Sequence, residues 1–157
     1  MNLFASKEEV PEAEVAMRTT EGSLSTSQVF GIHVSLMTAR RSGGYHSVPH
    51  SHDCEQLNLV TDGDIWIFIE EAAFHLHPGD YLRIPPSRIH WAWNRSTSDC
   101  VLLEAHSPGL DILPVESTPF LLDNQEPSDS VQKVKMEWFP DYPIETAEQV
   151  VAPDGTP

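Results

Sequence analysis

Three histidines and one glutamine stand at spacings that suit the binding of a metal ion. The run from His50 to Gln56 places His52 and Cys54 at alternate positions between them, and His90 follows 34 positions after Gln56. Alternate residues of a strand face the same side, so these side chains can point together if the run is extended. Imidazole and oxygen donors suit Zn, Fe, Mn, Ni or Cu without selecting one of them. We therefore expect one divalent transition metal ion.

The two cysteines, Cys54 and Cys100, follow no pattern typical of a disulfide framework or a cysteine-based zinc site. We expect both to be reduced thiols. Cys54 lies between two proposed ligands and is a candidate for contacting substrate. Its alternative role is that of a small apolar filler on a packed strand.

Three further histidines need a separate interpretation. His75 and His77 repeat the His-x-His unit, but a Pro-Gly-Asp turn follows them without a nearby Gln or Glu. We expect them to be solvent-facing strand residues. His46 shares the parity of His50 and is either an extra ligand, a proton carrier or a loop histidine, of which the sequence favours the last.

The elements that must position these residues are short strands. A chain of 157 residues fits one domain with a single hydrophobic core. Short β-rich runs are predicted at residues 29–37, 55–61, 64–70, 74–77, 81–84, 90–93 and 100–106, with Gly, Pro, Asn and Asp in the breaks between them. Many short strands without a long helical period predict an all-β sandwich or barrel.

The composition changes on both sides of this β-rich region. Residues 1–27 are rich in Ser, Thr and Glu and predict a mobile arm or a short docking strand. Residues 28–108 form the predicted barrel. Residues 109–157 hold seven of the thirteen prolines, and their ten acidic and two basic residues give −8 of the formal charge of −15, which predicts a wrapping, Pro-rich acidic extension.

Composition also limits the partners. Nine Lys and Arg residues spread along the chain give no footprint for nucleic acid. No apolar stretch approaches the ~18–20 residues that span a bilayer, and residues 1–10 contain acids where a secretory signal is apolar. We expect a cytoplasmic protein with a small-molecule substrate, and a homodimer. Trp91 and Trp93 have the opposite parity to His90 and are expected to pack outward, against a second sheet or a partner subunit.

Two longer spacing patterns include the candidate ligands. The first runs Gly44, five residues, His50-x-His52, three residues, Gln56, six residues, Gly63; the second runs Gly79, five residues, Pro85-x-Ser87, two residues, His90, three residues, Asn94. Together they resemble the two motifs of the cupin superfamily, with Gln56 in place of Glu and Ser87 in place of Gly. The resemblance implies a single small antiparallel barrel, the double-stranded β-helix or jelly roll, with the metal held inside by His50, His52, Gln56 and His90.

The exchange of Glu for Gln at position 56 replaces an anionic ligand with a neutral one. A divalent metal would then keep its full +2 charge among the protein ligands and act as a stronger Lewis acid. The alternative is that Gln56 merely preserves the shape of the site while the metal does the same work.

Glu104 and His106 are candidate catalytic residues on the last predicted strand. Both alternate with apolar neighbours, and a carboxylate inside a barrel is costly unless it is paired or working. Glu104 is therefore a candidate general acid/base. Alternatively it faces solvent or orients a ligand histidine. Arg83 and Arg88, near the predicted barrel mouth, are candidates for holding an anionic substrate or a carboxylate of the protein.

The ligand set resembles that of the cupins that open the ring of unsaturated uronates, in which a carboxylate occupies the place of Glu104. His106 stands where those enzymes carry an aromatic residue, and the basic residue expected shortly after Pro108 is absent. The set is also similar to that of cupin hydroxynitrile lyases and some polyketide cyclases. The resemblance implies an isomerase, lyase or cyclase that acts on a small carbonyl or sugar-acid-like compound without redox change. The alternatives are an Fe-dependent dioxygenase and a non-catalytic ligand-binding cupin.

Overall fold

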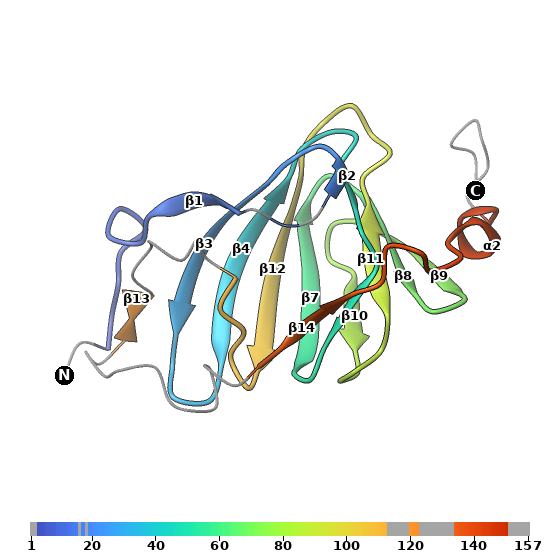
Figure 1. Cartoon of the computed structure of the whole chain (residues 1–157). Coiled ribbons are helices and arrows are strands. Elements are labelled where there is room, and N and C mark those ends of the chain that lie inside the picture. Colours follow the sequence, from blue (N-terminus) through green and yellow to red (C-terminus); the bar gives the residue numbers. More distant parts are fainter. Residues whose placement is uncertain (1–2, 16, 18, 113–119, 123–133, 151–157) are drawn as a thin grey trace.

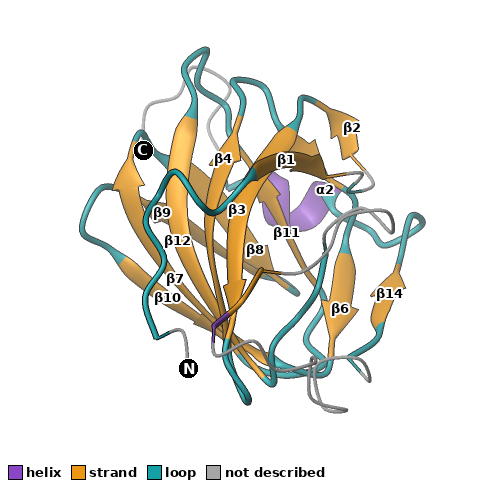
Figure 2. Ribbon diagram, turned by 90° about the vertical axis from the view of Figure 1, so that its left-hand side faces the viewer, coloured by secondary structure: helices purple, strands orange, loops and turns teal. Residues whose placement is uncertain are grey.

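Two β-sheets face each other and form a barrel, as the computed structural model shows (Figures 1 and 2). The structure describes residues 3–15, 17, 19–112, 120–122 and 134–150. The all-β barrel that the sequence predicts is therefore confirmed. Within the described residues, no helix is long and apolar enough to cross a membrane.

The first sheet forms the wall of the barrel that lies opposite the three candidate histidine ligands. In spatial order its strands are β1 (Glu12–Val15), β3 (Leu24–Phe30), β4 (Ser35–Arg41), β12 (Cys100–Ser107), β7 (Glu55–Asp62) and β10 (Tyr81–Ile84), and β13 (Phe120–Leu121) pairs with β3. Every second residue of β4 and β12 is buried, as expected for strands with one face toward a core. This alternation aims Glu104 and His106 into the barrel.

The second sheet carries the three candidate histidine ligands. Its path runs β14 (Met136–Trp138), β6 (His50–His52), β11 (His90–Trp93), β5 (His46–Ser47) and β2 (Thr19–Glu21), while β8 (Ile65–Ile69) pairs with β11 and with β9 (Ala72–Leu76). β14 belongs to the C-terminal extension and lies beside β6 (Figure 2). The short helix α2 (Glu145–Glu148) lies next to β9 (Figure 1).

One predicted strand is wrong. Residues 29–37 form the end of β3, a turn and the start of β4, with a hydrogen bond from the Gly31 N–H to the Val34 carbonyl at 2.8 Å. Ile32 and Val34 favour a strand by residue type, yet both are exposed in the turn. The two strands pair in register around this turn, so the pairing overrides the local β preference. The segment expected as an arm supplies strands to both sheets, through β1, β2 and the first residues of β3.

The C-terminal extension covers the outer face of the second sheet. Trp91 is fully buried there, stacked on Phe68 with ring centroids 4.9 Å apart and within 5.7 Å of the Tyr142 ring. It thus packs outward, and its contact comes from the extension of the same chain. The Glu148 carboxylate accepts a hydrogen bond from Trp91 Nε1 at 2.9 Å and lies 2.7 Å from His46 Nε2.

We expect Glu148→Ala to lower the free energy of unfolding by about 1–3 kcal/mol, because it leaves the buried indole N–H of Trp91 and a nitrogen of His46 without their acceptor. Urea unfolding followed by tryptophan fluorescence measures this change. Glu145→Ala is the matched control, since Glu145 is exposed on the same helix and should change stability by less than about 0.5 kcal/mol. Equal effects of the two variants would show that the Glu148 contacts do not hold the extension in place.

Candidate metal centre

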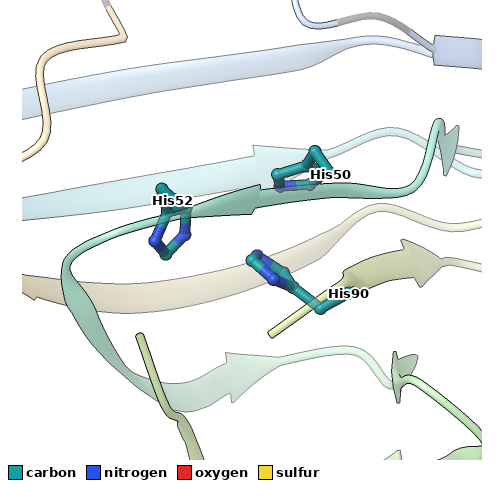
Figure 3. Close-up of side chains that lie close together, drawn as sticks. All are labelled: His50, His52 and His90. Atoms are coloured by element: carbon teal, nitrogen blue, oxygen red, sulfur yellow. The ribbon is translucent and has the colours of Figure 1, made fainter. Parts of the chain in front are cut away.

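Three buried histidines converge inside the barrel. His50 and His52 come from β6 and His90 from β11, and these strands pair with His90 directly opposite His50. One ring nitrogen from each residue lies within 4.8 Å of the others (Figure 3). The side chains are buried, and spacing of this kind allows one metal ion to contact all three.

Backbone carbonyl groups fix the orientation of each imidazole. The Nδ1 atoms of His50 and His90 lie 2.9 Å from the carbonyl oxygens of Val48 and Arg88, and Nδ1 of His52 lies 3.0 Å from that of Cys54. An Nδ1–H that donates to a carbonyl leaves the lone pair of Nε2 free for a metal. Nε2 of His90 is buried without a hydrogen-bond partner among the described residues. A metal ion would satisfy that atom.

Burial keeps two of these imidazoles neutral. It lowers the pKa of His50 to about 4, and with help from the neighbouring histidines it lowers the pKa of His90 well below its usual value. A histidine must be neutral to bind a metal, so ligand-competent forms predominate at neutral pH.

Gln56, on β7, completes the predicted ligand set. Its Oε1 lies 3.0 Å from Nε2 of His52, while its Nε2 donates to Asn58 Oδ1 at 2.8 Å and to Glu104 Oε2 at 3.1 Å. A neutral imidazole donates from one nitrogen only, yet both nitrogens of His52 face oxygen atoms. A cation bound by both Nε2 of His52 and Oε1 of Gln56 would resolve this conflict. The four residues therefore fit a metal ion.

Glu104 is buried beside this group and is paired with an arginine. It is 1% exposed, and its Oε1 lies 2.5 Å from Nη2 of Arg41. Sequence reasoning missed Arg41, because the strand predicted at 29–37 stopped before it. With the observed bounds of β4, the alternation that buries Met37 and Ala39 also places Arg41 inside. The Arg41 guanidinium lies over the ring of buried Tyr45, 5.6 Å from its centroid.

His106 lies on the same wall of the cavity as Glu104. It stands opposite Gln56 in the pairing of β12 with β7, and its ring centroid is 5.7 Å from that of His52. The side chain is 2% exposed, and its Nδ1 has no hydrogen-bond partner within the described part of the chain. Burial lowers the pKa of His106 to about 3, so the ring is neutral at pH 7. A neutral ring nitrogen without a partner is available to a substrate.

Cys54 lies against a ligand histidine. Its Sγ is 3.1 Å from Nδ1 of His52, and it is absent from the residues that line the described cavity. Burial raises the pKa of the Cys54 thiol to about 12, so it stays protonated. This placement favours the role of a packed filler that supports His52.

The two candidate arginines lie outside the cavity. Arg83 is exposed on β10 and forms an ion pair with Glu55, and Arg88 donates from Nη1 to both oxygens of Glu70 at 2.9 and 3.1 Å. Neither is among the residues that line the described cavity. Each holds a carboxylate of the protein, the second of the two roles considered for them.

The other histidines are placed away from the metal candidates. His75 stacks on Trp66 with ring centroids 4.4 Å apart and lies 2.7 Å from Asp64, and His77 is exposed beside it. His46, expected in a loop, begins β5 and is buried between Thr20 and Glu148.

The histidines line a partly open cavity, in which the space that can hold water-sized molecules is about 40 Å³. The polar residues gather at the metal candidates. The remaining wall is largely apolar and consists mainly of Met17, Leu24, Met37, Tyr45, Ile67, Ile84, Leu110, Ile112 and Met136. Met17, Ile112 and Met136 come from segments outside the core strands, and no local sequence signal could have assigned them to this wall.

Residues 39–106 match the family model described as the cupin domain. Residues 39–106 are a cupin domain. The match spans both spacing motifs, and the two-sheet architecture agrees with it. Ser87 stands in place of the glycine of the second cupin motif. Its φ is 62°, in the left-handed region that favours glycine.

Solved cupin structures share this fold at low sequence identity. The polyketide cyclase RemF from Streptomyces resistomycificus is 14% identical, with a TM-score of 0.61 over 98% of this chain and 96% of that one. KdgF from Halomonas sp. is 20% identical, with a TM-score of 0.58 over 67% and 94% of the two chains. An RmlC-like cupin from Shewanella frigidimarina is 19% identical, with a TM-score of 0.57 over 69% and 92%. No curated protein sequence matches the chain significantly.

Proposed function

We propose that this cupin is a metal-dependent enzyme that catalyses redox-neutral chemistry on a small carbonyl compound: isomerisation, elimination, cyclisation or ring opening. The observation that carries the proposal is the convergence of three histidines and the neutral Gln56 amide. One divalent transition metal held by these residues would supply a Lewis acid that polarises a carbonyl group. None of these four residues is a carboxylate, so no protein ligand would offset the charge of the metal ion.

The cavity favours a neutral, largely apolar substrate over a sugar acid. Arg41 is the one cationic side chain among the described cavity residues, and Glu104 already neutralises it. Arg83 and Arg88 lie outside and are paired. A uronate carboxylate would therefore find no arginine without an ionic partner. An apolar carbonyl compound agrees with the methionine, leucine and isoleucine wall, and the polyketide cyclase RemF has the same overall fold.

His106 is the better placed of the two candidate proton carriers. Its neutral ring lines the cavity and has an unpartnered Nδ1. Because burial makes this ring a weak base, it can accept a proton only from a carbon acidified by polarisation of the neighbouring carbonyl group. Both oxygens of Glu104 are already engaged, one by Arg41 and one by Gln56.

Exchange of substrate protons with solvent tests this proposal. Small aryl β-dicarbonyl compounds in D₂O, followed by ¹H NMR, should lose their α-proton signal faster with metal-loaded protein than with chelator-treated protein. His106→Gln should slow the exchange by about 10²–10⁴-fold, with His77→Gln at an exposed position as control. An oxygen electrode should record no uptake. Oxygen consumption in step with product would favour the dioxygenase, and tight binding without exchange or turnover would favour a ligand-binding cupin.

A further inference from the structure

Four buried polar side chains form one connected line through the barrel: Arg41, Glu104, Gln56 and Asn58. We propose that Glu104 is a positioning residue that aims the carbonyl oxygen of Gln56 at the metal, and that Glu104 is the reason why position 56 holds glutamine. The inference rests on the metal site of the proposed function. It assigns to Glu104 a role other than proton transfer.

The hydrogen bonds allow one orientation of the Gln56 amide. Its NH₂ group faces two oxygen atoms, Oδ1 of Asn58 at 2.8 Å and Oε2 of Glu104 at 3.1 Å. A turn of the amide by 180° would place Oε1 against both of these acceptors. The observed orientation instead leaves Oε1 facing Nε2 of His52, on the side where the histidines converge. The amide is thus held before any metal arrives.

Arg41 keeps the carboxylate of Glu104 in place as the acceptor. Its Nη2 lies 2.5 Å from Oε1 of Glu104, and both side chains are buried. This contact engages one oxygen and leaves Oε2 for Gln56. A glutamate at position 56 would bring a second carboxylate to the place of the Gln56 NH₂ group, about 3 Å from Oε2 of Glu104. Two carboxylates at that separation in a buried site repel each other.

Asn58 does not impose the same restriction. Its Nδ2 is buried without a hydrogen-bond partner among the described residues, so a turned amide could donate to a glutamate at position 56. Glu104 has no comparable freedom, because a carboxylate only accepts hydrogen bonds when ionised. The requirement for glutamine at position 56 therefore comes from Glu104, and an exchange of the two residue types should satisfy both positions again.

Three variants of the full chain test this coupling: Gln56→Glu, Glu104→Gln and the double variant Gln56→Glu/Glu104→Gln. In the double variant, the amide introduced at position 104 can donate from its NH₂ group to the carboxylate introduced at position 56, while its carbonyl oxygen faces Arg41. Thermal unfolding, metal content after dialysis against chelator, and the visible spectrum with Co²⁺ are measured for each. Glu104→Gln alone should lower the thermal midpoint by more than about 3 °C and weaken metal binding by about 10–100-fold.

We expect the effect of Glu104→Gln on stability and metal retention to reverse direction with the residue at position 56. Glu104→Gln should lower the thermal midpoint and metal retention when Gln is at position 56, and should raise both when Glu is there, with the Co²⁺ spectrum returning toward that of the unmodified protein. A purely structural Glu104 would give losses in both backgrounds, which would overturn the inference. If the unmodified protein binds no Co²⁺ or other metal, the proposed function itself fails, so the two failures are distinguishable.

Discussion

Replacing His52 by alanine is expected to remove stable metal binding. His52 donates one of the three converging nitrogens and also lies against the oxygen of Gln56, so its loss affects two of the four ligands. Loss of a hydrogen-bond partner outside the ligand set typically lowers metal affinity by about 10–100-fold. Loss of the ligand His52 itself should lower the affinity by more than this. Competition with a chromophoric chelator measures the dissociation constant, and far-UV circular dichroism checks that the barrel is folded.

The second His-x-His pair of the chain provides the matched control. His77 is exposed directly after β9, away from the converging histidines, so His77→Ala should bind metal with unchanged affinity. Unchanged affinity in His52→Ala, or an equal loss in His77→Ala, would show that the metal binds elsewhere.

Replacing Arg41 by alanine should produce the largest loss of stability. It removes the buried cation 2.5 Å from Glu104 and leaves the carboxylate in the barrel without its ion pair. Removal of one partner of a buried ion pair typically costs about 3–5 kcal/mol. The free energy of unfolding in urea, measured at pH 7 on chelator-treated protein, gives the change without any contribution from bound metal.

Arg40 is the control for this experiment, because it is the neighbour of Arg41 on β4 and points to the other side. Its side chain is 50% exposed and lies 4.0 Å from Glu12 and 3.7 Å from Asp99. Exposed pairs of this kind contribute about 0–1 kcal/mol. Arg40→Ala should therefore be nearly neutral, and a loss equal to that of Arg41→Ala would contradict the assignment of Arg41 to the interior.

The sequence predicted the convergence of His50, His52 and His90 because local spacing and strand alternation determine it. His50 and His52 share a face of one strand, and Gln56 and His90 follow at the spacings of the two motifs. Alternation also aimed Glu104 and His106 inward, as β12 shows. These features depend on residues that are close in sequence or on motifs with fixed intervals.

Other parts of the site depend on pairing between distant segments. Arg41 was missed because the strand predicted at 29–37 runs across the turn at Ile32 and Val34 and ends before Arg41, whereas β4 runs from Ser35 to Arg41. β14 pairs with β6, which places Trp138 opposite His50 with ring centroids 5.2 Å apart, and Met136 in the cavity wall. No local pattern around Met136 specifies that partner, since strand pairing depends on the whole fold.

The metal content of the unmodified protein tests the central claim most directly. Full-length protein purified without added metal, and without a metal-affinity step, should be examined by elemental analysis together with His50→Ala. We predict about one equivalent of a divalent transition metal per chain in the unmodified protein and a large loss in the variant, because His50 contributes one of the three converging imidazoles. A metal-free protein that also fails to bind Zn²⁺, Fe²⁺, Mn²⁺, Ni²⁺ or Cu²⁺ when these are supplied would contradict the account.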